Sequence, residues 1–250
     1  MEEKQKVVNK ILEYGRRLEK IVKFDPTLNP EANKLFTDED DFSTAFFFGV
    51  IFDQSIPAEQ AWEKPFILKQ RLGHLDVKKI SKMKDDELKV IFNEAPKLHR
   101  FPNNYAEYIK DASKMLIDKY KGNAANIWND NPLCAELQRR FESFKGIGQK
   151  KASMATNILT RDLGIQARNK RGIDVSYDEH VKRVFLRTSL AETDDENTII
   201  KTARELNPYY PGELDLPMWY IGKGWCHPTN PKCDECPIGD VCPKNNKREK

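Results

Sequence analysis

Apolar residues recur with a period near 3.6 along most of the chain, and this pattern predicts a succession of helices. A first amphipathic helix is predicted to run to about Lys23, and Gly122 is predicted to end a long later helix. No alternating strand pattern of useful length is present, so the predicted class is all-α. The apolar face of the long helix consists of Tyr105, Tyr108, Ile109, Ala112, Met115, Leu116 and Tyr120.

Proline and glycine predict where several helices begin and end. Pro57 suits a first helical turn and Gly73 suits a stop. Between them, Pro65 is expected to interrupt any single helix, because it lacks an N–H group and clashes with the preceding turn. Pro132 is expected to begin another helix.

Capping residues predict further helix starts. Asp76 and Asp85 each precede or open a short helical pattern, where an acidic side chain can accept free backbone N–H groups. Thr193 and Glu196 have the spacing of a capping box. A turn-rich stretch, 164–178, then separates a central group of helices from a C-terminal part that carries most of the cysteines.

The composition is that of a globular protein, with 250 residues, 39% of them hydrophobic and 32% charged. No stretch is apolar enough to span a bilayer, so no membrane partner is expected. The N-terminus shows no signal-peptide pattern, which predicts a cytoplasmic location, nucleoid-associated in a prokaryote. The net charge of +3 does not by itself indicate nucleic acid, although the tail 243–250 is basic.

Four of the five cysteines fall within residues 226–242. In a reducing compartment such a cluster indicates a metal site rather than disulfides. Four thiolates suit zinc as well as iron–sulfur, but the C-x6-C-x2-C-x5-C spacing differs from that of paired zinc knuckles and favours a [4Fe–4S] cluster. Cys134 stands apart in a helical pattern and is expected to be a small buried hydrophobe.

A glycine hairpin is the second informative stretch. Gly146 and Gly148 flank Ile147, and a helix follows at once. Glycines permit a tight turn and a close backbone approach to a ligand. The N–H groups and dipole at the following helix start suit a phosphate, so these three residues are candidate DNA contacts. The alternative is an ordinary turn between helices.

Three lysines crowd this hairpin: Lys145, Lys150 and Lys151. A cation is normally disfavoured at a helix N-terminus, and such a local misfit invites a functional explanation. Phosphate binding is one explanation, with Lys145 and Lys151 as DNA contacts. A lysine at the helix start is also expected to have a depressed pKa, and a neutral amine is a nucleophile.

Downstream, Asp178 and His180 lie at the beginning of another predicted helix. Asp178 is a candidate acid, but an N-cap role would explain it without any chemistry. His180 is expected to be a structural histidine.

Taken together, these stretches resemble the helix–hairpin–helix DNA glycosylase superfamily, and most closely its iron–sulfur branch, typified by endonuclease III. Residues 144–152 read Phe-Lys-Gly-Ile-Gly-Gln-Lys-Lys-Ala, where that family has Leu-Pro-Gly-Val-Gly-Arg-Lys-Thr-Ala. Residues 177–180 read Tyr-Asp-Glu-His, where the family has Val-Asp-Thr-His. Cys226, Cys233, Cys236 and Cys242 match the spacing of the family's cluster ligands.

The resemblance implies a two-domain helix–hairpin–helix fold with a C-terminal [4Fe–4S] loop. A central helical bundle, 38–172, would end in the helix–hairpin–helix, and 1–37 with 173–250 would form the cluster domain. Lys150 falls on the family's nucleophilic lysine and Asp178 on its aspartate.

The resemblance is looser in the N-terminal half. The stretch 51–62 looks like the loop that carries a glutamine wedge in the family, which makes Gln54 a candidate. The stretch 98–109 looks like the second intercalating loop, with Arg100 or Phe101 as the residue that fills the gap left by an extruded base.

The implied function is base excision repair. A monomeric DNA glycosylase with AP lyase activity would flip a damaged base, an oxidised pyrimidine, out of double-stranded DNA. Lys150 would form a Schiff base, with Asp178 as its electrostatic and acid–base partner. The sequence departs from the family at Phe144, Lys145 and Glu179 and in a longer gap between Lys150 and Asp178. A monofunctional glycosylase for a mismatched or other modified base, and a non-catalytic iron–sulfur DNA-binding protein, remain alternatives.

Overall fold

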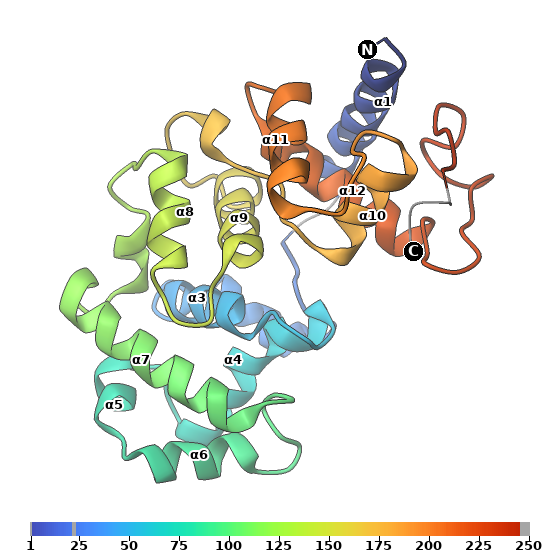
Figure 1. The fold of residues 1–250 in the computed structure, drawn as a ribbon. Coiled ribbons are helices and arrows are strands. Elements are labelled where there is room, and N and C mark those ends of the chain that lie inside the picture. Colours follow the sequence, from blue (N-terminus) through green and yellow to red (C-terminus); the bar gives the residue numbers. More distant parts are fainter. Residues whose placement is uncertain (1, 22–23, 246–250) are drawn as a thin grey trace. The chain divides into compact units, whose positions relative to one another are not determined.

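The computed structural model describes residues 2–21 and 24–245 (Figure 1). The predicted end of the first helix at Lys23 and the last part of the basic tail, 246–250, lie outside the described residues. Within them, no helix is long and apolar enough to cross a membrane.

The all-α prediction is confirmed: every regular element in the described part of the chain is a helix, and it has no β-strand, only an isolated bridge between Leu133 and Arg168. The α-helices are α1 (Glu2–Glu19), α2 (Pro30–Asn33), α3 (Phe42–Phe52), α4 (Ala58–Leu72), α5 (Val77–Lys82), α6 (Asp85–Asn93), α7 (Pro102–Tyr120), α8 (Cys134–Glu142), α9 (Gln149–Asn157), α10 (Glu179–Arg187), α11 (Glu196–Leu206) and α12 (Asp215–Gly224). Short 3₁₀ helices cover Lys34–Phe36, Ala124–Ile127, Lys170–Gly172 and Pro211–Leu214, and a π-helix, Ile158–Asp162, extends α9.

Two compact units make up the chain. The hairpin unit consists of Phe24–Asn131 and Arg139–Lys151. The cysteine unit consists of Met1–Lys23, Pro132–Gln138 and Ala152–Lys250. The domain boundaries implied by the family resemblance, at 37/38 and 172/173, stay a prediction.

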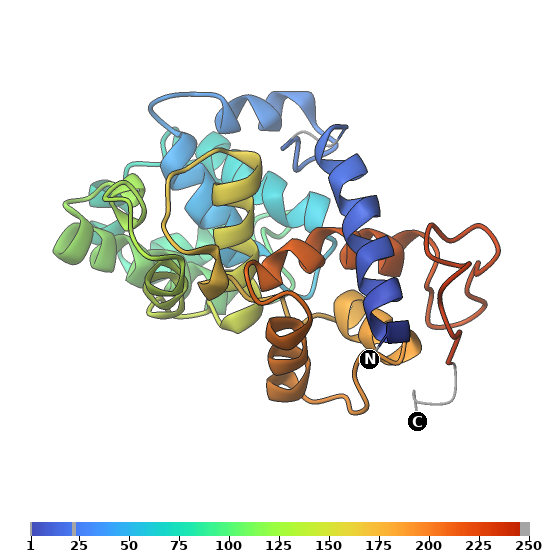
Figure 2. The same cartoon turned by 90° about the horizontal axis from the view of Figure 1, so that it is seen from above.

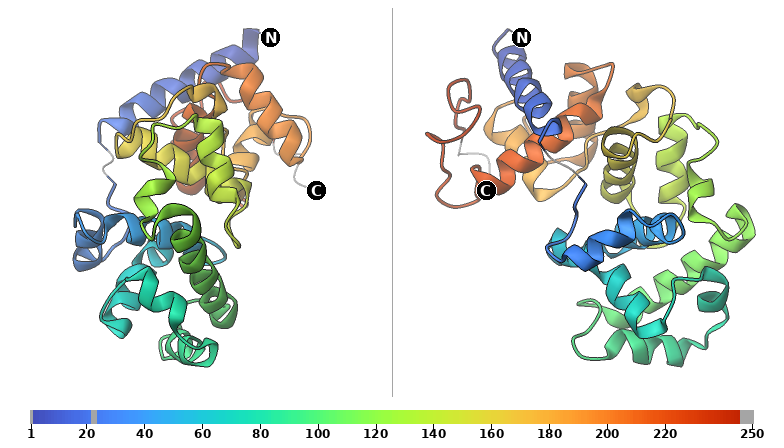
Figure 3. Two further views of the ribbon diagram at one scale, coloured as in Figure 1. Left: turned by 90° about the vertical axis from the view of Figure 1, so that its left-hand side faces the viewer. Right: turned by 180° about the vertical axis from the view of Figure 1, so that it is seen from behind.

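The core of the hairpin unit is built around α3, whose residues 45–52 are all buried. The close approach of α4 depends on Gly49, since a Cβ there would lie 2.5 Å from the Trp62 ring. Around the same core, α5 and α6 pack against α7, as Figure 3 shows. A helix that is apolar on every side must be covered on every side.

In the cysteine unit, α12 lies against α10 and α1 (Figure 2). Val8 and Ile11 of α1, Phe185 of α10 and Met218 of α12 are fully buried in one cluster. The chain after α12 has no regular helix among its described residues and carries the four cysteines.

Two predicted helix boundaries are wrong. Pro65 lies inside α4 and does not interrupt it. Its side chain is buried, so tertiary packing outweighs one lost backbone hydrogen bond. Pro132 does not begin α8, which starts at Cys134. The Pro132 carbonyl accepts from the Arg168 N–H (2.8 Å), and the Cys134 N–H donates to the Arg168 carbonyl (2.8 Å). Residues 132–134 therefore pair with Arg168 in an extended conformation instead of forming a helical turn.

The predicted capping box at Thr193 is also wrong, because Asp195 is the N-cap of α11. Its Oδ2 accepts from the Thr198 N–H at 2.8 Å. A carboxylate is the stronger cap here, since its charge interacts favourably with the helix dipole. Asp76 caps α5 as predicted.

Candidate functional site

The glycine hairpin joins α8 to α9 within residues 143–148. Gly146 has φ +85°, and a Cβ there would lie 2.7 Å from the Tyr108 ring, so only glycine fits. A Cβ built on Gly148 meets no atom within 4 Å, so the backbone there can be approached closely. Of the two predicted glycine contacts, Gly148 therefore offers open backbone and Gly146 shapes the turn.

Ile147 and Lys145 are less available than expected. The Ile147 side chain is buried, and its N–H donates to the Phe144 carbonyl at 3.1 Å. The Lys145 amine pairs with Glu107 and lies 3.6 Å from Asp111. The hydrogen bond to Glu107 raises the pKa of Lys145, so this side chain is a cation whose charge is already balanced.

Lys150 lies in the first turn of α9 with 38% of its side chain exposed. Its Nζ is 3.5 Å from Oδ1 of Asp53, a side chain with only 7% exposure. Asp53 follows directly on α3, so two segments far apart in sequence meet at the lysine amine. The amine is thus paired with a buried carboxylate, on a side chain that is partly exposed.

Lys151 differs sharply from its neighbour, with only 4% exposure. Its Nζ donates to the carbonyls of Ile51 (2.6 Å) and Gly146 (2.8 Å), and it lies over the Tyr105 ring. Burial lowers the pKa of Lys151 to about 8, against the opposing attraction of Asp53. The depressed pKa expected for a lysine at this helix start therefore occurs at Lys151, and its cause is burial. The amine connects the hairpin to the C-terminal end of α3.

Gln54 and Phe101, the two predicted wedge positions, share one histidine. The backbone carbonyl of Gln54 lies 2.8 Å from Nε2 of His99, and the backbone N–H of Phe101 donates to Nδ1 of the same ring at 3.1 Å. Burial lowers the pKa of His99, which favours the neutral ring. Because Nδ1 accepts, the proton must be on Nε2, which then donates to Gln54.

The side chains of these loops also contact one another. The Tyr105 hydroxyl donates to Oε1 of Gln54 at 3.3 Å, and the Tyr105 ring stacks on His99 with centroids 3.5 Å apart. The Arg100 guanidinium lies over the Phe101 ring, and Phe101 is 48% exposed. Gln54, Arg100 and Phe101 thus come together in the hairpin unit.

Asp178, in the cysteine unit, is the N-cap of α10. Its Oδ1 accepts from the N–H groups of His180 (2.9 Å) and Val181 (2.8 Å). The turn before it rests on Asp215, whose buried Oδ1 accepts from the Ser176 N–H at 2.6 Å. Burial raises the pKa of Asp215 to about 6. The capping role is therefore present, and it fixes the Asp178 carboxyl at the helix start.

His180 is a packed, structural side chain. Its Nδ1 lies 3.0 Å from Nη2 of Arg183, and Gly222 allows its backbone a close approach. Burial lowers the pKa of His180. Arg183 also donates to the Cys226 carbonyl at 2.6 Å, which links α10 to the cysteine loop.

All four loop cysteines line one cavity, together with Arg187, Ile238 and Gly239. Among the described residues, no set of three or more His, Cys, Asp or Glu side chains lies close enough to hold a single metal ion. The four thiols around one cavity are the donor set that a [4Fe–4S] cluster requires. Gly239 approaches the Cys233 carbonyl so closely that a side chain is excluded.

The charges around the cavity suit thiolate ligands. Burial raises the pKa of the Cys236 thiol to about 11, so a thiolate there needs a positive partner. Nη1 of Arg187 lies 3.6 Å from Sγ of Cys226, and the Lys244 N–H donates to Sγ of Cys242 at 3.4 Å. Iron supplies the remaining positive charge in a cluster of this kind. Cys134, in contrast, is fully buried away from this loop.

Comparison with known proteins finds similarity to endonuclease III. The iron–sulfur binding domain of endonuclease III matches residues 226–242. Endonuclease III from Bacillus subtilis (strain 168) is 25% identical over 151 residues, which are 59% of each chain. Endonuclease III from Haemophilus influenzae is 27% identical over 59% of this chain and 61% of its own. These matches agree with the resemblance of the chain to the helix–hairpin–helix DNA glycosylase superfamily.

Solved structures of this superfamily have the same fold. A trapped endonuclease III–DNA covalent intermediate superposes with a TM-score of 0.67 at 18% identity over 96% of both chains. A thermostable thymine-DNA glycosylase gives a TM-score of 0.64 at 17% identity, again over 96% of both chains. In sequence, the chain matches about three-fifths of the length of its curated endonuclease III relatives.

The match over residues 226–242 supports the predicted [4Fe–4S] cluster, because it spans the four loop cysteines. Cys226, Cys233, Cys236 and Cys242 stay its predicted ligands. Sequence reasoning singled out this loop by its spacing. It missed Asp53, which looked like a mere neighbour of Gln54, and His99, which joins the two loops. The one available signal for Asp53 was a lone charge after a long apolar run.

Proposed function

We propose that this protein is a base excision repair glycosylase with AP lyase activity that acts on a damaged base, an oxidised pyrimidine, in double-stranded DNA. One observation carries the proposal. The Lys150 amine lies in the first turn after the glycine hairpin, 38% exposed and 3.5 Å from the Asp53 carboxylate. A monofunctional enzyme has no need of an accessible amine at this point.

Recognition of DNA would begin at the hairpin. The open backbone beside Gly148 and the start of α9 suit a phosphate, which fixes the protein on the duplex without reading its sequence. Because the target base is unreachable in the stack, it must be flipped out at a cost of a few kcal/mol. Gln54 and the exposed Phe101, joined through His99, would fill the gap.

The chemical step would use Lys150 as the nucleophile. Its neutral amine forms a bond to C1′ of the deoxyribose while the C1′–N bond breaks, and the base leaves with that electron pair and takes up a proton. Asp178 would stabilise the positive charge on the sugar and accept the proton lost by the amine. The C1′–O4′ bond then breaks and O4′ takes up a proton, so that the sugar ring opens and C1′ and the lysine nitrogen form a Schiff base. The Schiff base loses a C2′ proton, and the C3′–O bond breaks in β-elimination with the phosphate as the leaving group. The [4Fe–4S] cluster supplies structure to the loop and takes no part in these bonds.

Borohydride trapping on a panel of lesion duplexes tests the proposal. We expect wild-type protein to form a covalent adduct and Lys150→Ala to form none, because reduction captures only the Schiff base. Lys151→Met is the matched control, since its buried amine donates to two carbonyls and should not react. If Lys150→Ala forms a normal adduct, Lys150 is not the nucleophile. The same conclusion follows if Lys151→Met is the only variant that loses the adduct.

Two further outcomes separate the alternatives. Base release with no trapped adduct would identify a monofunctional glycosylase. Binding of lesion DNA with neither activity would identify a non-catalytic DNA-binding protein. Asp178→Asn keeps a good N-cap but removes the charge, so we expect base release to slow by roughly 100-fold or more with unchanged thermal stability.

A further inference from the structure

Asp53 is an acidic residue in a position where both burial and the helix dipole disfavour a negative charge. It follows eight consecutive buried residues, 45–52, at the C-terminal end of α3, and is itself only 5% exposed. Burial disfavours a carboxylate. The carbonyl end of a helix is negative, which disfavours it again. A residue that breaks two rules at once requires a compensating interaction, and such violations concentrate at functional sites.

The compensation comes from the first turn of α9. Nζ of Lys150 lies 3.5 Å from Oδ1 of Asp53. The same carboxylate attracts the amine of Lys151, which donates a hydrogen bond to the Ile51 carbonyl. Tyr105 completes the surroundings, since its pKa is raised by burial and by the nearby Asp53 charge. Asp53 is therefore paired with the Lys150 amine and lies near enough to Lys151 and Tyr105 to affect their pKa values.

The flexibility of Lys150 creates a problem for a nucleophile, because a four-carbon side chain that is 38% exposed has many conformations. A buried carboxylate solves this difficulty: because α3 fixes it, it holds the Lys150 amine at one place. The same carboxylate balances the charge of the neighbouring Lys151. Effective reaction requires such pre-positioning of the attacking atom.

We propose that Asp53 is a positioning residue for Lys150: it fixes the nucleophilic amine beside the hairpin and offsets the charge of Lys151. The inference rests on the proposed function, because it assigns Asp53 a task in the same reaction. It adds a second carboxylate to the site, from the segment that also carries the wedge candidate Gln54. Asp53 forms no bond to substrate.

The test is Asp53→Asn, which removes the charge and keeps the shape. We expect the single-turnover rate of adduct formation to fall by about 10-fold or more, because the amine is no longer held in place. The dissociation constant for lesion DNA should change by less than about three-fold, since Asp53 touches no phosphate in this proposal. Asp53→Glu keeps the charge, so it should recover part of the lost rate.

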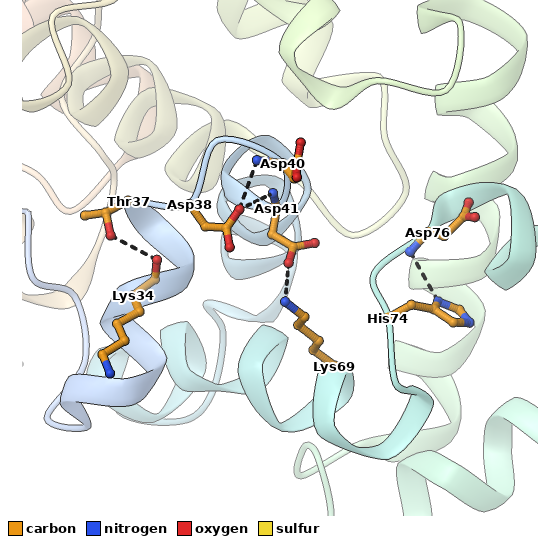
Figure 4. Close-up of polar contacts among 8 residues, drawn as sticks. All are labelled: Lys34, Thr37, Asp38, Asp40, Asp41, Lys69, His74 and Asp76. Carbon is orange, nitrogen blue, oxygen red and sulfur yellow. Dashed lines mark hydrogen bonds and ion pairs between the residues drawn. The ribbon is translucent and has the colours of Figure 1, made fainter.

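Asp41→Asn is the matched control. Figure 4 shows Asp41 and its contact with Lys69. Asp41 lies at the opposite end of α3 and also pairs with a lysine, Lys69 of α4. The same chemical change there removes a partly buried ion pair far from the hairpin lysines in sequence. We expect adduct formation to stay within about two-fold of wild type.

The outcomes separate this inference from the function on which it rests. If wild-type protein forms no adduct and releases no base, the proposed function fails and Asp53 has no such task. If wild-type protein reacts and folded Asp53→Asn reacts equally fast, the positioning role is wrong and the function stands. If Asp53→Asn does not fold, Asp53→Ser decides, because it also removes the carboxylate: a folded variant that reacts as fast as wild type would overturn the role.

Discussion

The glycine hairpin and the cysteine loop are both short, irregular segments that carry the family's motifs, yet they are held in opposite ways. The hairpin is held by its own side chains. Phe144 and Ile147 are buried, and the ring centroids of Phe144 and Phe47 lie 4.6 Å apart. The cysteine loop has no regular helix, and Ile238 is its fully buried apolar residue.

The difference teaches how each segment keeps its shape. So short a loop cannot bury enough apolar surface to order itself, so the cluster must supply the missing free energy. The hairpin needs no cofactor, because glycine geometry, aromatic packing and the Lys151 amine order it. The chemistry proposed for the protein therefore lies where the chain itself fixes the atoms.

The largest expected effect is on the loop. Cys236→Ala removes one cluster ligand, and we expect loss of iron and a fall of at least about 4 kcal/mol in the free energy of unfolding. Visible absorption, iron content and thermal melting measure these changes. Cys134→Ala is the control: it should cost about 1 kcal/mol through a small cavity and leave the iron in place. Equal iron content and stability in both variants would contradict the comparison.

On the hairpin side, the next effect is a pH dependence from Lys151. Its pKa in the folded protein is about 8, below the ordinary value of 10.5. Between these pH values the unfolded state binds the extra proton, so wild-type stability should rise with pH through this window. The gain relative to Lys151→Met should approach ~3 kcal/mol between pH 7 and 10.5. Urea unfolding at several pH values measures it, and parallel curves for the two proteins would contradict it.

A smaller effect separates the two hairpin glycines. Gly146→Ala puts a Cβ against the Tyr108 ring at φ +85°, and should cost about 2 kcal/mol. Gly148→Ala meets open space, so its stability cost should stay below about 1 kcal/mol. Under the proposed function, Gly148→Ala should instead weaken DNA binding, because the new methyl group lies where phosphate approaches. Reversed costs would show that packing does not define the turn.

The predictable and unpredictable parts of the site divide by distance along the chain. The hairpin, the Asp178 cap and the cysteine ligands follow from local residue types and spacings. Asp53 did not, because its role depends on a contact with a residue far along the chain. Nor could sequence tell which neighbouring lysine is buried, since adjacent helical residues point about 100° apart and tertiary packing decides between them.

The fold followed the same division. Helix periodicity predicted the class and most helices, but the continuity of α4 through Pro65 and the late start of α8 depend on tertiary contacts. The N-cap of α11 was predicted at Thr193, but the structure has it at the charged Asp195.

The bridging ring of His99 also limits which amino acids can occupy that position during evolution. Nε2 of the ring donates a hydrogen bond to the backbone carbonyl of Gln54, and Nδ1 accepts one from the backbone N–H of Phe101. Few side chains combine both capacities with a flat face for stacking on Tyr105. Glutamine has the donor and the acceptor but lacks the ring, and phenylalanine has the ring alone. A change at this position would therefore uncouple the two loops, so that each would be free to vary in length and sequence independently of the other.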